Sequence, residues 1–148
     1  MHPLHANPGA LTLGGNWLLY TDGAARGNPG PAAIGAVLYR DDDGRMHEVD
    51  TVSETIGVAT NNVAEYKAVI AGLKMAAART PQLLIVRADS LLLIRQLAGR
   101  YRVRNANLQP LHREAMELLA PMSYRLQHVR REQNTRADDL ANAALDRG

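Results

Sequence analysis

The chain has 148 residues, of which 46% are apolar, enough for one domain with a buried core. It contains no cysteine, which excludes a disulfide framework, a thiolate zinc site and a cysteine nucleophile. Its formal net charge is only +2, and an aromatic content of 4% leaves little material for a platform that stacks single-stranded bases.

The N-terminal residues 1–15 contain two prolines and a glycine pair without hydrophobic periodicity, so we expect a flexible leader there. We expect residues 16–148 to form one domain. No apolar run approaches the roughly 18 residues that a membrane span requires. We therefore predict a cytoplasmic protein without a membrane partner, which agrees with the absence of cysteine.

Three extended segments open the domain. The first, Trp17–Tyr20, is a short apolar run that ends in Thr21-Asp22-Gly23, and it predicts a strand that delivers Asp22 at its end. Turn-rich residues separate it from the second segment, Ile34–Arg40, and another turn precedes the third, Met46–Val58. Two hairpin connections predict that these strands are antiparallel neighbours.

A helix follows, because apolar residues recur at three- and four-residue intervals from Val63 to Ala77. Asn61 or Asn62 is its predicted cap, which puts Glu65 in the first turn. The apolar run Leu83–Val86 predicts a buried, parallel-type strand that leads to Asp89. The remaining predicted elements are a helix Leu91–Leu97 capped by Ser90, a helix from Pro110 to Leu119, a strand Tyr124–Val129 and a helix Ala137–Leu145.

This order of elements predicts an α/β fold with a mixed five-stranded sheet, in which two parallel strands are added to three antiparallel ones. About four helices flank the sheet.

Four carboxylates lie at the ends of predicted elements: Asp22, Glu65, Asp89 and Asp138. Each alone has a structural explanation, because Asp-Gly is a common turn and an acid in a helix's first turn is stabilised by the dipole. If the four converge, their repulsion raises the proton affinity of at least one unless a cation intervenes. Magnesium suits such a set, and two ions about 3.5–4 Å apart can activate water and stabilise a leaving oxygen at a phosphodiester.

The charge is unevenly distributed along the chain. Between Arg79 and Arg136 there are eleven arginines and four acids, a local excess of +7, whereas the flanking segments carry more acids than bases. A phosphate backbone would favour such an arginine-rich half, and a solvated helical face would have the same composition.

Four segments, in order, give the chain a resemblance to the type 1 ribonuclease H family, and the resemblance covers nearly everything after residue 15. It is closest to the compact branch that lacks a basic protrusion, and it implies the ribonuclease H-like fold. The matching segments are Tyr20–Pro31, Thr60–Tyr66, Val86–Ser90 and Asn134–Ala141.

The resemblance implies an endonuclease that cleaves the RNA strand of RNA–DNA hybrids and leaves 5′-phosphate and 3′-hydroxyl ends. It assigns Asp22, Glu65, Asp89 and Asp138 as catalytic residues that bind two Mg²⁺ ions, with Mn²⁺ as a substitute. Asp138 is chosen over Asp139 because it shares a helical stripe with Ala141. The hybrid duplex is the expected partner of a monomer that needs no other protein.

The same resemblance predicts the substrate contacts. The amides of Asn28, Asn61 and Asn62 can both donate to and accept from a ribose 2′-hydroxyl, which does the same, so a site can require RNA without reading bases. The alternative is that these residues only make turns and cap the helix. The full set of expected substrate-binding residues is Gly23, Asn28, Thr60, Asn61, Asn62, Arg100, Arg102, Arg104 and Asn105.

The chain departs from the wider family in two features, the segment that would bind the substrate's phosphates and the position of a histidine. The arginines of residues 99–105 occupy the place of the missing protrusion, and they either bind phosphate or solubilise a loop. His128 has the family's distance to Asp138, which makes it a candidate catalytic residue, but it falls at the end of a predicted strand instead of in a loop. The alternative is that Arg130, Arg131 or Glu132 occupies the space.

Two other functions remain open at this point. A resolvase- or integrase-type nuclease would cut DNA on the same fold, but the asparagine-rich segments suit ribose hydroxyls. A catalytically silent module would bind the hybrid only, but all four carboxylates are present.

Overall fold

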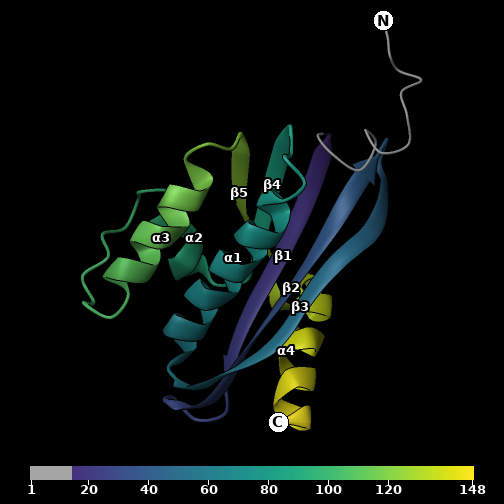
Figure 1. Ribbon diagram of the computed structural model, residues 1–148. Helices are drawn as coiled ribbons and strands as arrows, with labels where there is room; N and C mark the ends of the chain where they lie inside the picture. The colour runs from purple at the N-terminus through teal and green to yellow at the C-terminus, as the bar shows by residue number, and fades with distance from the viewer. Residues whose placement is uncertain (1–14) are drawn as a thin grey trace, which may run out of the picture.

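The computed structural model describes residues 15–148, so the predicted leader lies outside the described residues except for Gly15. The predicted α/β fold is confirmed: a five-stranded mixed sheet has the order β3-β2-β1-β4-β5, with helices on both faces (Figure 1). The strands are β1 (Asn16–Ala25), β2 (Gly30–Asp42), β3 (Arg45–Ala59), β4 (Leu83–Ala88) and β5 (Tyr124–His128). The helices are α1 (Asn61–Ala77), α2 (Leu91–Leu97), α3 (Gln109–Leu119) and α4 (Thr135–Arg147), with a 3-10 turn η2 (Arg131–Gln133) before α4.

The central strand β1 has partners of different length on its two sides. It pairs antiparallel with β2 as far as Ala25, but its parallel pairing with β4 ends at Thr21 opposite Ala88. The prediction that Asp22 ends its strand is therefore wrong, because the antiparallel ladder continues through the Asp-Gly pair. Asp22 instead occupies the first position of β1 beyond the end of β4.

The helices divide between the two faces of the sheet. Side chains of α1, α2 and α3 form the main core with β1, β2 and β4, around large buried residues such as Trp17, Tyr66 and Leu73. Helix α4 packs against the opposite face (Figure 1). It crosses β2 at Gly35, where a Cβ atom would lie 2.1 Å from the Ala137 carbonyl oxygen, so only glycine permits this approach.

Helix α3 begins one residue earlier than predicted, and the starts of α1 and α4 also lie earlier in the chain. Thr60, not Asn61 or Asn62, caps α1 by accepting a hydrogen bond from the Val63 amide, and this moves Glu65 beyond the first turn. The prediction that Glu65 lies in the first turn is thus wrong, because the cap lies one residue earlier. Helix α4 starts at Thr135, directly after η2.

Within residues 15–148, no helix is both long and apolar enough to cross a membrane.

Candidate active site

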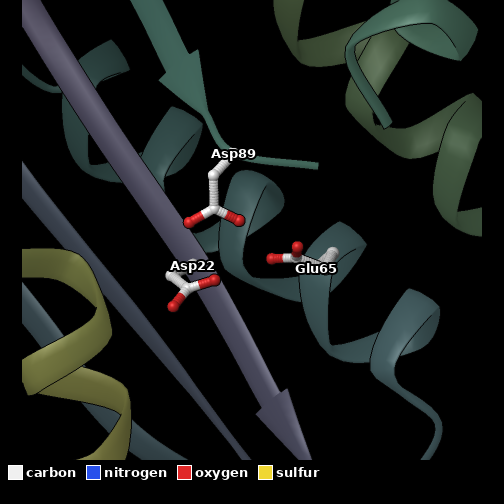
Figure 2. Close-up of side chains that lie close together, drawn as sticks. All are labelled: Asp22, Glu65 and Asp89. Atoms are coloured by element: carbon white, nitrogen blue, oxygen red, sulfur yellow. The ribbon is translucent and has the colours of Figure 1, made fainter. Parts of the chain in front are cut away.

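Three carboxylates from three different elements meet at the end of β4. Oxygens of Asp22 on β1, Glu65 on α1 and Asp89 after β4 all lie within 4.8 Å of one another. Figure 2 shows the Asp89 carboxyl group pointing toward Asp22, with the Glu65 carboxyl group reaching toward both aspartates from its helix. The sequence prediction that these residues converge therefore holds in three dimensions.

Asp138, in the first turn of α4, lies next to the three clustered carboxylates. It lines an open cavity of about 470 Å³ together with the three clustered carboxylates. Its side chain is half-buried, whereas its neighbour Asp139 is exposed, as the helical stripe predicted. All four predicted carboxylates thus face one cavity.

Burial and neighbouring charge make two of these carboxyl groups, those of Asp22 and Glu65, hard to ionise. Burial is the largest cause that raises the pKa of Asp22 to about 9, and the negative charges of Glu65, Asp89 and Asp138 add to it. Burial also raises the pKa of Glu65 to about 7, although the Gly23 amide and the charge of Arg131 act in the opposite direction. Asp22 and Glu65 therefore hold their protons more tightly than ordinary carboxyl groups do.

Glu65 reaches the cluster because β1 and α1 touch at Gly23. A Cβ atom at Gly23 would lie 2.2 Å from the backbone carbon of Ala64, which no side chain tolerates. The close approach lets the Gly23 amide donate a hydrogen bond of 2.7 Å to Glu65 Oε1. The contact between β1 and α1 therefore requires glycine at position 23.

Asn28 and Asn61 connect the Gly27–Pro31 turn to the start of α1. Asn28 Oδ1 accepts from the Asn61 amide, and Asn61 Oδ1 accepts from the Ala25 amide. Asn61 also lines the cavity of the carboxylates. Both side-chain oxygens are therefore engaged within the protein, and the Nδ2 groups are the parts of these exposed side chains that can face a ligand.

The other predicted substrate residues lie outside the lining of this cavity, as far as residues 15–148 describe it. Asn62 and Thr60 are exposed at the start of α1, and the Thr60 hydroxyl caps the helix. Asn105 is exposed, and its Oδ1 accepts from the Asn107 amide. Arg100 and Arg102 line a separate cavity of about 750 Å³ between α2 and α3, and Arg104 is exposed on the same loop.

The candidate histidine lies beside the cluster but on its outer side. His128 ends β5, as predicted, and its Nε2 lies 3.2 Å from the backbone oxygen of Asp89. Among the alternatives left open, Arg131 on η2 is the one that lines the carboxylate cavity. The sequence left open whether Arg130, Arg131 or Glu132 takes the place of the histidine. In the structure a cationic side chain, that of Arg131, borders the acidic residues.

Two asparagines that contact the carboxylates were not assigned a role from the sequence. Asn142 Nδ2 donates to Asp138 Oδ1 at 3.1 Å, and Asn134 Nδ2 donates to Asp89 Oδ2 at 3.1 Å. The spacing of Asn142, four residues after Asp138, is a signal for the first contact because such residues share a helix face. The contact between Asn134 and Asp89 joins residues 45 positions apart and has no local signal.

Comparison with known proteins shows which family shares these features. The reverse transcriptase-like family matches residues 20–144. A curated ribonuclease HI of Halobacterium salinarum is 46% identical over 134 residues, which are 90% of this chain and 66% of the relative. A bifunctional protein of Mycobacterium tuberculosis is 40% identical over 131 residues, which are 87% of this chain and 35% of that protein. The chain thus spans about two thirds of the length of the Halobacterium relative and about one third of the length of the Mycobacterium protein.

Solved structures have the same fold. The crystal structure of RNase H1 from Halobacterium salinarum superposes with a TM-score of 0.85 and 44% identity, over 90% of this chain and all of that one. An RNase H1 named LC11, solved in complex with an RNA/DNA hybrid, has a TM-score of 0.81 and 37% identity, over 88% of this chain and 97% of its own.

Proposed function

The chain belongs to the reverse transcriptase-like family and, within it, to the type 1 ribonucleases H, and from that premise we propose that it hydrolyses the RNA strand of RNA–DNA hybrids. The observation that carries the proposal is the meeting of Asp22, Glu65 and Asp89 within 4.8 Å in an open cavity that Asp138 also lines. The similarity to a protein solved with an RNA/DNA hybrid supports the substrate class.

The residues present fit a divalent metal. Four carboxylates face one cavity, and the oxygens of three of them are close enough to share an ion. Burial raises the pKa values of Asp22 and Glu65, negative neighbours raise them further, and a hard divalent cation held between the carboxylates would offset both effects. We assign Asp22, Glu65, Asp89 and Asp138 as the residues that would hold two Mg²⁺ ions, with Mn²⁺ as a substitute.

When bound, the two ions supply an activated water and stabilise the departing 3′ oxygen, which gives 5′-phosphate and 3′-hydroxyl ends. The protein's own part is to hold the carboxylates in place. The Gly23 amide fixes Glu65 through Oε1, and Asn142 fixes Asp138 through Oδ1. Arg131, at the edge of the cavity, provides a positive charge where a scissile phosphate would approach.

Recognition of RNA falls to the loop that Asn28 and Asn61 hold. Since the Oδ1 atoms of both residues accept backbone hydrogen bonds, their Nδ2 groups remain to donate to ribose 2′-hydroxyl oxygens. This surface is extended by three exposed polar residues, Thr60, Asn62 and Asn105, which can contact the sugar-phosphate backbones of the RNA and DNA strands. No base contact is part of the proposal.

The same proposal includes a monomeric protein that acts in the cytoplasm without an obligatory protein partner. Light scattering during size-exclusion chromatography tests the first part. A molar mass near 16.1 kDa is expected, and twice that mass would contradict it.

The decisive experiment is a cleavage assay with matched RNA–DNA, RNA–RNA and DNA–DNA duplexes, with and without Mg²⁺. We expect metal-dependent cutting of the RNA strand of the hybrid. Asp22→Asn should reduce cleavage to background and preserve hybrid binding, because it removes a metal-holding charge within an otherwise unchanged fold.

Asp139→Asn is the matched control, since Asp139 is exposed next to the site and its replacement should leave the rate unchanged. Cutting of DNA–DNA duplexes would indicate the resolvase-type alternative. Tight hybrid binding without cleavage in any metal would indicate a silent binding module. Near-normal cleavage by the Asp22→Asn protein would refute the site.

A further inference from the structure

One buried residue contacts three of the four segments that carry the carboxylates, two through its side chain and one through its backbone oxygen. Asn134 is 1% exposed and lies between η2 and α4. Its Nδ2 donates to the Thr21 backbone oxygen at 2.9 Å and to Asp89 Oδ2 at 3.1 Å. Its own backbone oxygen accepts from the Asp138 amide at 3.2 Å. Asn134 thus connects β1 next to Asp22, the end of β4 and the first turn of α4.

The chemistry of these neighbours determines which way the amide faces. The Thr21 carbonyl and the Asp89 carboxylate are acceptors, so only the NH₂ end of the amide can serve both. The reverse orientation would point an oxygen at two other oxygens. Within residues 15–148, Asn134 Oδ1 consequently has no hydrogen-bond partner, although it is buried.

This orientation is unusual for a residue at the start of a helix. An asparagine at this position normally uses its side-chain oxygen to accept from a free amide of the first turn. Asn134 makes no such capping bond to α4 in the described chain, and its side chain is directed at the carboxylate site instead. Aspartate and serine cap helices as well as asparagine does, but neither offers two N–H donors.

We propose that Asn134 is a positioning residue that holds the Asp89 carboxylate in place relative to β1, so that Asp89 and Asp22 meet a metal ion in a fixed arrangement. The proposal rests on the proposed function. The hydrogen bond restrains Asp89 Oδ2, while His128 Nε2 lies 3.2 Å from the Asp89 backbone oxygen. Neighbours that orient a metal ligand typically contribute about 10–100-fold to metal affinity or activity.

The test compares Asn134→Ala and Asn134→Ser with the wild-type protein. Mg²⁺ affinity is measured by calorimetry without substrate, and KM for the hybrid and the Mg²⁺ requirement are measured by cleavage. We expect Mg²⁺ affinity to fall about 10–100-fold, with hybrid KM unchanged and part of the lost rate regained at high Mg²⁺. Serine can cap α4 with its hydroxyl group, so the serine variant provides a folded α4 if the alanine variant does not fold.

Gln96→Leu is the matched control. Gln96 is also a buried amide, 5% exposed, and it accepts a hydrogen bond from the Tyr66 hydroxyl at 2.6 Å within the core. Its replacement should lower thermal stability without changing Mg²⁺ affinity, as expected for a purely structural amide.

The two proposals fail in different ways. Wild-type Mg²⁺ affinity and Mg²⁺ requirement in both folded Asn134 variants would overturn the positioning role while the wild-type enzyme still cleaves hybrids. Equal losses of metal affinity in the Gln96 and Asn134 variants would also overturn it. A wild-type protein that neither binds Mg²⁺ nor cleaves the hybrid would overturn the proposed function and this inference together.

Discussion

Charge at individual residues dominates the chemistry of the site. Asp22 is 7% exposed, and three other carboxylates surround it. Asp22 was identified from its type and position in the sequence, but its burial depends on β2, α1 and α4 closing around it. Asn134 shows the opposite case, because an asparagine at the start of a helix usually caps it, whereas this side chain donates to a carboxylate.

The raised pKa of Asp22 gives the metal-free protein a pH-dependent stability. A carboxyl whose pKa rises from 3.8 to about 9 on folding binds its proton more tightly in the folded state. Protonation therefore stabilises the fold fully below pH 3.8, and this stabilisation is lost as the pH rises toward 9. We expect the unfolding temperature of the metal-free wild type to fall, relative to Asp22→Asn, between pH 5 and pH 8.

Calorimetric unfolding in the presence of a chelator measures this difference. Added Mg²⁺ should raise the unfolding temperature of the wild type at pH 8 more than at pH 5, because protons and metal compete for the same oxygens. If the unfolding temperatures of the wild type and of Asp22→Asn changed with pH in parallel, the raised pKa would not belong to Asp22.

At the scale of elements, backbone contacts decide where the carboxylates lie. Strand β1 approaches α1 at Gly23, and α4 crosses β2 at Gly35. The sequence predicted the elements and their order, because apolar periodicity and turn residues are local signals. It placed the end of β1 and the start of α1 incorrectly, because the ladder with β2 and the Thr60 cap outweighed the Asp-Gly and Asn-Asn signals.

Gly23→Ala tests the contact between β1 and α1. The added Cβ would overlap the backbone of Ala64, so α1 must move away and Glu65 with it. We expect a loss of about 1–3 kcal/mol in unfolding free energy, together with a large loss of cleavage. Urea denaturation and the hybrid cleavage assay measure the two effects.

Gly44→Ala is the control for backbone strain alone. Gly44 has a φ of +89° in the turn between β2 and β3, and a Cβ there meets nothing within 4 Å. This variant should lose some stability and retain its cleavage rate. Full activity in the Gly23→Ala protein would show that the position of Glu65 tolerates a shifted helix.

At the scale of the whole molecule, the uneven distribution of charge along the chain corresponds to two separate cavities, one lined by carboxylates and one lined by arginines. Four of the fifteen acidic residues line the cavity where β1, β4, α1 and α4 meet, and Arg100, Arg102 and Arg113 line the cavity between α2 and α3. The net charge of +2, which is the balance of 17 basic and 15 acidic residues over the whole chain, does not reveal this separation. Such a separation suits a duplex that is held by its phosphates at one place and cut at another.

Replacing Arg100 and Arg102 together with glutamine tests the role of the arginine-lined cavity. If both contact phosphates, hybrid affinity should fall and the slope of log affinity against log salt should decrease by about 2. The rate at saturating hybrid should stay the same, because neither residue lines the carboxylate cavity. Fluorescence anisotropy across a salt series measures the slope.

Arg45 and Arg125 provide a control with the same change of charge. Both are exposed, Arg45 at the start of β3 and Arg125 on β5. Their double replacement with glutamine should affect binding only weakly. Equal effects of the two double variants would indicate that net charge, and no particular surface, attracts the hybrid.

The sequence by itself determined the order of the elements, the mixed sheet and the identity of the four carboxylates, because these depend on local periodicity and on motifs within short segments. Only the tertiary structure decided that Asp22 lies one position beyond the end of β4 and that Arg131 borders the cavity. It also decided that the Asn134 amide faces Asp89. These features depend on strand register and on contacts between residues far apart in the chain, for which no local pattern exists.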